Sequence, residues 1–308
     1  MATPSEKLAD SLEVLNGLQE NGIIAIKSSL LTRTHKERLL KNGFISEVYS
    51  GWYIISSPEL KEGDSTSWYS SYWQFCAQFL NVKYKDQWCI SAEQSLMIYA
   101  GNWSVPKQLI IKSPKANNFK TDFPFDTSLF QMKSKLPLNT EVVKINGMRV
   151  LSLASALVNA SLNTYTRNTT DVRTALSLVN SSSDILAILL NGGHSTIAGR
   201  LAGAFRNIKK DKIADDILKT MKGVGYDVRE LNPFNDNLNI VFSSRDISPY
   251  ANRLRIMWSE FRNVIIDNFP AAPGKPINIE KYINTVKEIY VTDAYHSLSI
   301  EKYQVTPE

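Results

Sequence analysis

The sequence predicts an α+β protein with more than one domain. Its 308 residues, 43% of them hydrophobic, are enough for two or three domains of ordinary size. Two segments have the pattern of paired strands around a tight turn, at Ser50-Gly51 and at Asn146-Gly147, whereas the chain after Ser152 carries apolar residues at helical spacing. We therefore expect an N-terminal winged helix-turn-helix, a mixed α/β middle domain, a helical domain and a final helical region, with boundaries at 1–57, 58–151, 152–247 and 248–308.

The N-terminal region has the element order of a winged helix-turn-helix. An amphipathic helix with leucine at every third or fourth residue opens the chain and ends at Asn21-Gly22. A second, basic helix is expected over residues 32–42, with Leu39 and Leu40 packed inward. The runs FISEVY and WYII then follow as two strands around a turn, which is how a winged helix ends.

The basic helix supplies the candidate DNA contacts. Five of its side chains are predicted to project outward, namely Arg33, His35, Lys36, Arg38 and Lys41. In a major groove such side chains contact phosphates and bases. On a protein-interaction or dimerisation module the same charges would be a solvated face, and both hypotheses are kept. The net charge of +5 and the pI near 9.0 fit either one.

The middle region begins with a strongly aromatic segment. Residues 68–79, WYSSYWQFCAQF, place aromatic side chains at helical spacing, which predicts a row facing the core rather than a platform for stacked bases. Residues 91–99 are expected to form a helix and QLIIK a strand. Residues 113–138 show no clear periodicity and are predicted to be a loop-rich connection that could include an edge strand.

The last two regions are predicted to be helical. Within residues 211–223 an apolar stripe is expected, made of Ile213, Ile217, Leu218 and Met221. A long helix should follow near residues 248–268, with four large side chains facing inward, which are Leu254, Met257, Trp258 and Phe261. We expect this helix and the final one, which begins near Ile279, to pack back to back.

Several kinds of chemistry have no pattern in this sequence. Cys76 and Cys89 are the only cysteines and no Cys/His cluster occurs, so neither a disulfide framework nor a metal site is predicted. The glycines follow no phosphate-loop pattern. No run approaches the roughly 20 apolar residues of a membrane span, and the N-terminus is charged and unlike a signal peptide. We therefore expect a cytoplasmic protein without a membrane partner.

One residue pair in the final helix points to a chemistry. Ser297 and Glu301 lie four residues apart, so that a helix would hold the carboxylate one turn beyond the hydroxyl. This pair resembles the inhibitory helix of Fic-family AMP-transferases, whose pattern is Ser or Thr, three residues, Glu and then Gly or Asn. Here Lys302 takes the last position, which departs from that pattern.

The resemblance implies a regulatory role for Ser297 and Glu301. In the family, the glutamate pairs with an arginine of the catalytic loop that would otherwise clamp the γ-phosphate of ATP, and a charge-assisted bidentate pair is strong enough for such a switch. The catalytic loop HPFxxGNGR does not occur in this sequence. The resemblance, which extends over the helical regions from Ser152, therefore implies the non-catalytic portion of a Fic AMP-transferase. A Fic core in cis or in trans would be its partner and would bring ATP and Mg.

Two further hypotheses need no enzyme. The N-terminal layout ending in YSGWYIIS resembles the first domain of abortive-infection antitoxins of the AbiE type, in which a winged helix is linked to repression of the protein's own operon. That resemblance implies a DNA-binding transcriptional repressor. An interaction scaffold without DNA binding is the third hypothesis.

Overall fold

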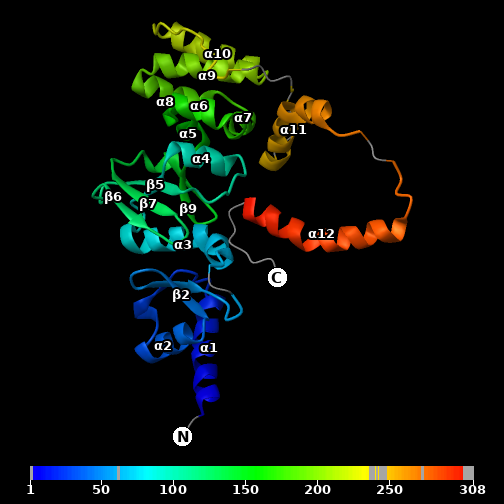
Figure 1. Cartoon of the computed structure of the whole chain (residues 1–308). Helices are drawn as coiled ribbons and strands as arrows, with labels where there is room; N and C mark the ends of the chain where they lie inside the picture. The colour runs from blue at the N-terminus through cyan, green and yellow to red at the C-terminus, as the bar shows by residue number, and fades with distance from the viewer. Residues whose placement is uncertain are drawn as a thin grey trace.

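The computed structural model describes residues 3–60, 63–235, 240, 242, 248–271 and 274–300. These residues form an α+β structure in which helices and three small sheets follow one another from the N-terminal end to α10 (Figure 1). Within the described residues, no helix is both long enough and apolar enough to cross a membrane.

The N-terminal elements enclose a small core of their own. They are α1 (Pro4–Glu20), β1 (Ile26–Lys27), the 3-10 helix η1 (Ser28–Leu30), α2 (Arg33–Lys41), β2 (Ile45–Tyr49) and β3 (Trp52–Ile55). The strands form an antiparallel sheet in the order β1-β3-β2. Thr3 starts α1 with a capping box that Glu6 completes. The buried residues of this core are Leu15, Ile26, Leu31, Leu39, Ile45 and Tyr53.

One detail of α2 differs from the prediction. Leu39 is fully buried, but Leu40 remains 36% exposed. Successive residues of a helix point about 100° apart. Because α1 and the sheet cover only the side of α2 that holds Leu39, the neighbouring Leu40 lies at the edge of the buried face.

The middle elements are a four-stranded sheet, a hairpin and two helices. They are α3 (Thr66–Tyr84), β4 (Cys89–Ile90), α4 (Ala92–Tyr99), β5 (Gln108–Ser113), β6 (Phe119–Asp122), β7 (Ser128–Lys133), η2 (Asn139–Glu141), β8 (Val142–Ile145) and β9 (Met148–Leu151). The sheet has the order β4-β5-β7-β6, and only β5 and β7 run parallel. The predicted hairpin is confirmed as β8 and β9, joined by Asn146 and Gly147, both at positive φ.

The aromatic row of α3 forms the core between these elements, as predicted. Its buried members are Trp68, Tyr72, Phe75, Cys76 and Phe79. The α3 helix also holds the N-terminal elements, because the ring of Trp52 in β3 lies 5.1 Å from that of Phe79. In addition, the amide oxygen of Gln78 accepts hydrogen bonds from the backbone N–H groups of Ile24 and Ala25 at 2.9 and 2.7 Å.

The prediction for residues 113–138 is correct only in part: β6 is an edge strand, as the prediction allowed, but a second strand, β7, was missed. This segment contains β6 and β7, and β7 lies inside the sheet with a neighbour on each side. The inner face of β7 includes Gln131, which is fully buried, accepts from the hydroxyl of Tyr84 at 2.7 Å and donates to Thr121 at 2.8 Å. A polar residue at a core position removed the alternation that would have marked the strand.

The chain from Leu153 is helical. Its helices are α5 (Leu153–Asn159), α6 (Leu162–Arg167), α7 (Thr169–Ser177), α8 (Ser183–Gly192), α9 (Ser195–Asn207), α10 (Asp211–Gly223), α11 (Pro249–Asn268) and α12 (Ile279–Ile300). One core cluster extends from Cys89 and α4 through α5–α10 to Ile256 of α11. Three members of the predicted stripe in α10, which are Ile213, Ile217 and Met221, are buried there, and Leu218 packs against it. On α9, a side chain at Gly199 would lie 2.0 Å from the carbonyl oxygen of Arg229, so the segment after α10 can approach the helix closely.

The packing predicted for the last two helices is wrong. Three of the four residues expected to face inward from α11 are exposed, with Leu254 at 66%, Trp258 at 58% and Phe261 at 51%, and Met257 is half-buried. The buried residues of α11 are Asn252 and Ile256, which lie on the side that packs against α7. The α12 helix stands apart from α11 (Figure 1), and its described side chains are exposed or half-exposed.

Candidate functional site

The first candidate site is the outer face of α2. The helix begins after Thr32, whose Oγ1 accepts a hydrogen bond from the backbone N–H of His35 at 3.3 Å. Leu39 anchors its inner face beside α1, and the β2–β3 hairpin follows directly. Figure 1 shows α2 and the hairpin at the N-terminal end of the molecule. The sequence therefore presents one side of a short basic helix to solvent.

The five predicted DNA-contact residues do not all lie on that face. Arg33 and Lys41 are exposed, and Lys36 is half-exposed and donates to the Ser28 hydroxyl at 3.2 Å. His35 and Arg38 turn toward α1. Their contacts there are a hydrogen bond between His35 Nδ1 and Ser11 Oγ at 2.9 Å and one from Arg38 Nη1 to the Lys7 carbonyl at 3.0 Å.

The prediction that His35 and Arg38 project outward is therefore wrong. His35 lies one turn before the buried Leu39, Arg38 lies three residues after His35, and both side chains bond to residues of α1. The exposed residue Lys27 was missed, although it ends β1 and directly precedes Ser28, the residue that Lys36 contacts. We call Lys27, Arg33, Lys36 and Lys41 the basic face.

An intrahelical ion pair reduces the charge of the basic face. Arg33 Nε lies 2.7 Å from Glu37 Oε1, and this hydrogen bond raises the pKa of Arg33 and lowers that of Glu37. Both side chains are largely exposed, at 87% and 59%. Such solvated surface pairs contribute little to stability, so that a phosphate could displace Glu37 at little cost.

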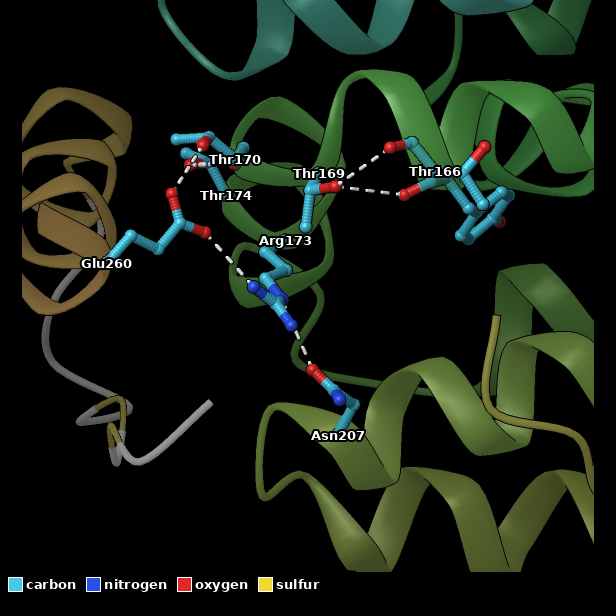
Figure 2. A network of polar contacts seen from close by, with 8 residues as sticks. Thr166, Thr169, Thr170, Arg173, Thr174, Asn207 and Glu260 are labelled. Carbon is cyan, nitrogen blue, oxygen red and sulfur yellow. Dashed lines mark hydrogen bonds and ion pairs between the residues drawn. The ribbon is translucent and has the colours of Figure 1, made fainter. Parts of the chain in front are cut away.

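The second candidate site is a polar network between α7 and α11 (Figure 2). Arg173 of α7 is fully buried, and its Nη1 donates to Glu260 Oε1 of α11 at 3.0 Å. Its Nε donates to Asn207 Oδ1 at 3.2 Å, and the guanidinium lies 4.6 Å from the ring centre of Phe234. The other oxygen of Glu260 accepts from the Thr170 hydroxyl at 3.0 Å. Because both oxygens have donors, Glu260 is poorly suited to act as a general base.

A second group of contacts ties α11 to the same helix. Asp171 accepts from the Asn102 amide at 2.8 Å and lies 3.6 Å from Arg253 Nη2. Burial raises the pKa of the Asp171 carboxyl, although Asn102 and Arg253 partly oppose this effect. A cavity of about 230 Å³ lies beside these groups and is lined by Arg167, Asn168, Thr169, Thr170, Asp171, Arg253, Met257 and Phe261. Sequence reasoning missed this network, because its partners are up to 90 residues apart.

The predicted inhibitory pair is only partly visible. Ser297 is exposed near the end of α12, whereas Glu301 lies outside the described residues. The distance and orientation of the two side chains are therefore not given by the structure, and their role stays a prediction.

Both cysteines are buried. Burial raises the pKa of Cys89 to about 11 and that of Cys76 further, so both thiols remain protonated near neutral pH. No cluster of three or more His, Cys, Asp or Glu side chains suited to a metal ion occurs among the described residues.

Comparison with family models, curated proteins and solved structures finds no match for this chain. Its function must be inferred from its own residues.

Proposed function

We propose that residues 1–57 form a winged helix-turn-helix that binds double-stranded DNA, and that the chain is a transcriptional repressor of the antitoxin type. The observation that supports this proposal is the element order α1, β1, η1, α2, β2, β3, with β1 paired to β3 and the β2–β3 hairpin directly after α2, which is the order expected of a winged helix. The basic face of α2 is the surface available to DNA. The proposal corresponds to the second of the three hypotheses drawn from the sequence.

In this proposal α2 enters the major groove and its cations hold the phosphates. Arg33 and Lys41 stand at the two ends of the helix, and Lys36 and Lys27 lie near the wing. Contacts of this kind position a protein on DNA through charge, and their affinity depends strongly on salt. His35 and Arg38 have a supporting role, because they fix α2 against α1.

Reversing two charges of the basic face tests the proposal. We expect the Arg33→Glu/Lys41→Glu variant to lose most of its affinity for DNA from upstream of its own gene, because two phosphate contacts become repulsive. The slope of log affinity against log salt should fall by about two. Fluorescence anisotropy with labelled duplexes, at several salt concentrations, measures both quantities.

The matched control is Lys219→Glu/Lys222→Glu, which makes the same change in net charge on exposed residues of α10. This control should bind like the parent. Equal losses of DNA affinity in the two variants would mean that net charge alone, and not the basic face, accounts for the effect. A parent protein that binds no duplex at low salt would contradict the proposal outright.

A second candidate function is the regulatory portion of a Fic-type AMP-transferase. The observation that favours it is the exposure of α12, including Ser297, which leaves this helix open to a catalytic core supplied by another segment or chain. If Glu301 is inhibitory, it competes with the γ-phosphate of ATP for an arginine of that core. Lys302 stands where the family has Gly or Asn, so the resemblance is incomplete at this position.

A supplied Fic core tests this second candidate. We expect Glu301→Gly to raise AMP transfer and Ser297→Ala to have the smaller effect, because a neutral hydrogen bond contributes about 1 kcal/mol and one to a charged group about 1.5–3 kcal/mol. Labelled ATP and gel autoradiography measure the transfer. Unchanged activity in Glu301→Gly, with an active core in the same tube, would mean that Ser297 and Glu301 have no inhibitory role.

A further inference from the structure

The α11 helix has two opposite faces with opposite roles. Its inner face is fixed, because Ile256 is fully buried, Asn252 Nδ2 donates to Ser177 Oγ at 2.9 Å, and Glu260 is held by Arg173. The outer face carries four large apolar residues, 44–66% exposed, which are Leu254, Trp258, Phe261 and Ile265. Their spacing of four, three and four residues places them along one line, nearly opposite the inner contacts. We call these four outer residues the outer seam of α11. The inner contacts keep this seam turned toward solvent.

The α12 helix carries a seam with the same spacing. Its four members, 46–72% exposed, are Ile279, Ile283, Val286 and Tyr290. A rise of 1.5 Å per residue makes each seam about 16 Å long. The two seams thus match in length and in the spacing of their side chains, as the two sides of a helix-helix contact do.

The two seams together expose about as much apolar area as a protein-protein interface takes from one partner. Three of their eight members are aromatic, with about 150–250 Å² each, and five are smaller aliphatic residues. At about half exposure they leave on the order of 700 Å² uncovered per copy. A stable protein-protein interface takes about 800 Å² from each partner. The seams therefore expose what one copy would bring to a dimer.

We propose that a second copy of this chain covers these seams, with α12 of each copy packed on the outer seam of α11 of the other. This reciprocal arrangement buries both seams at once and obeys two-fold symmetry. It does not depend on the proposed function, although a dimer would present two N-terminal domains to a symmetric DNA site.

The connection between the helices favours exchange over a contact within one chain. Residues 269–278 include three prolines, at positions 270, 273 and 276, which favour an extended, stiff chain. The connection has ten residues, whereas helical hairpins usually have loops of two to five residues. In the structure α12 stands apart from its own α11 (Figure 1). A connection of this length lets α12 reach α11 of a neighbouring molecule.

Sedimentation velocity of the full chain over a wide concentration range tests the proposal. The parent should dimerise reversibly. Trp258→Glu/Phe261→Glu should weaken the dimer by about thirty-fold or more, since buried aromatic residues dominate such interfaces. The control Val82→Asp changes a residue of α3 that is 55% exposed and should leave the dimer intact. Circular dichroism checks that every variant is folded.

A second variant tests the reciprocal geometry. Ile283→Glu/Val286→Glu alters only α12 and should also dissociate the dimer. Mixed with the α11 variant, it should form a heterodimer that is tighter than either variant alone, because one unaltered α12 then meets one unaltered α11. A parent that stays monomeric at all concentrations would overturn the proposal, since α12 would then cover its own α11 or await another protein. The proposal would also be overturned if Val82→Asp weakened the dimer equally, or if the mixture of variants associated no more tightly than each variant alone.

Discussion

Replacing Trp68 by alanine is expected to lower the free energy of unfolding by about 4 kcal/mol, within the range measured for buried aromatic residues. Trp68 is 1% exposed, and its ring lies 5.3 Å from those of Tyr72 and Phe75 and 5.5 Å from that of Phe123. Its indole N–H also donates to Thr127 Oγ1 at 3.0 Å. The variant loses the apolar contacts, leaves a cavity and removes the donor from a buried hydroxyl.

Denaturant titration followed by circular dichroism measures this loss. The matched control is Trp258→Ala, which removes the same side chain from a site that is 58% exposed. In solution dilute enough for monomers, the control should change stability by no more than about 0.5 kcal/mol. If the two alanine variants lose equal stability, the aromatic row of α3 is not the core of this region.

Elements with a local signal could be predicted from the sequence. The aromatic row of α3, the Asn146-Gly147 hairpin and the stripe of α10 each depend on residues a few positions apart, and all three were predicted correctly. The α+β class followed from the same signals. The division into domains remains a prediction, because one core cluster joins α4 to the helices that follow residue 151.

Elements that depend on distant partners could not be predicted. The strand β7 is stabilised by a parallel neighbour and by a buried Gln131, so its sequence lacks alternation. For α11, apolar residues were expected to face inward, yet the polar side faces α7. There Asn252 and Glu260 meet Ser177 and Arg173, which lie 75 and 87 residues earlier. Amphipathic spacing showed that α11 has two faces, but not which face a partner covers.

The candidate DNA site could have been predicted more closely. His35 lies four residues before the buried Leu39, and residues at that spacing share a side of a helix, so its inward position could have been predicted. Arg38 is adjacent to Leu39 and about 100° from it, so its contact with the Lys7 carbonyl of α1 does not follow from helical geometry alone. Lys27 requires the pairing of β1 with β3, which the sequence does not show.

The largest effect expected outside the aromatic core comes from Glu260. We expect Glu260→Ala to lower the free energy of unfolding by about 3 kcal/mol, because breaking a buried ion pair removes a charge-assisted hydrogen bond from a guanidinium that stays buried. Arg173 has no exposed surface, and Glu260 Oε1 lies 3.0 Å from its Nη1. The Thr170 hydroxyl would lose its acceptor as well. Denaturant titration gives the global loss, and hydrogen exchange shows whether the amides of α11 open first.

Two further variants make this prediction specific to the ion pair. Glu288→Ala removes the same side chain from an exposed position on α12 and should be close to neutral. The double variant Arg173→Met/Glu260→Leu should recover much of the stability, since apolar side chains of similar volume often replace a buried ion pair without loss. A Glu260→Ala loss no larger than that of Glu288→Ala would mean that apolar packing around Ile256, rather than the Arg173–Glu260 pair, holds α11 on α7.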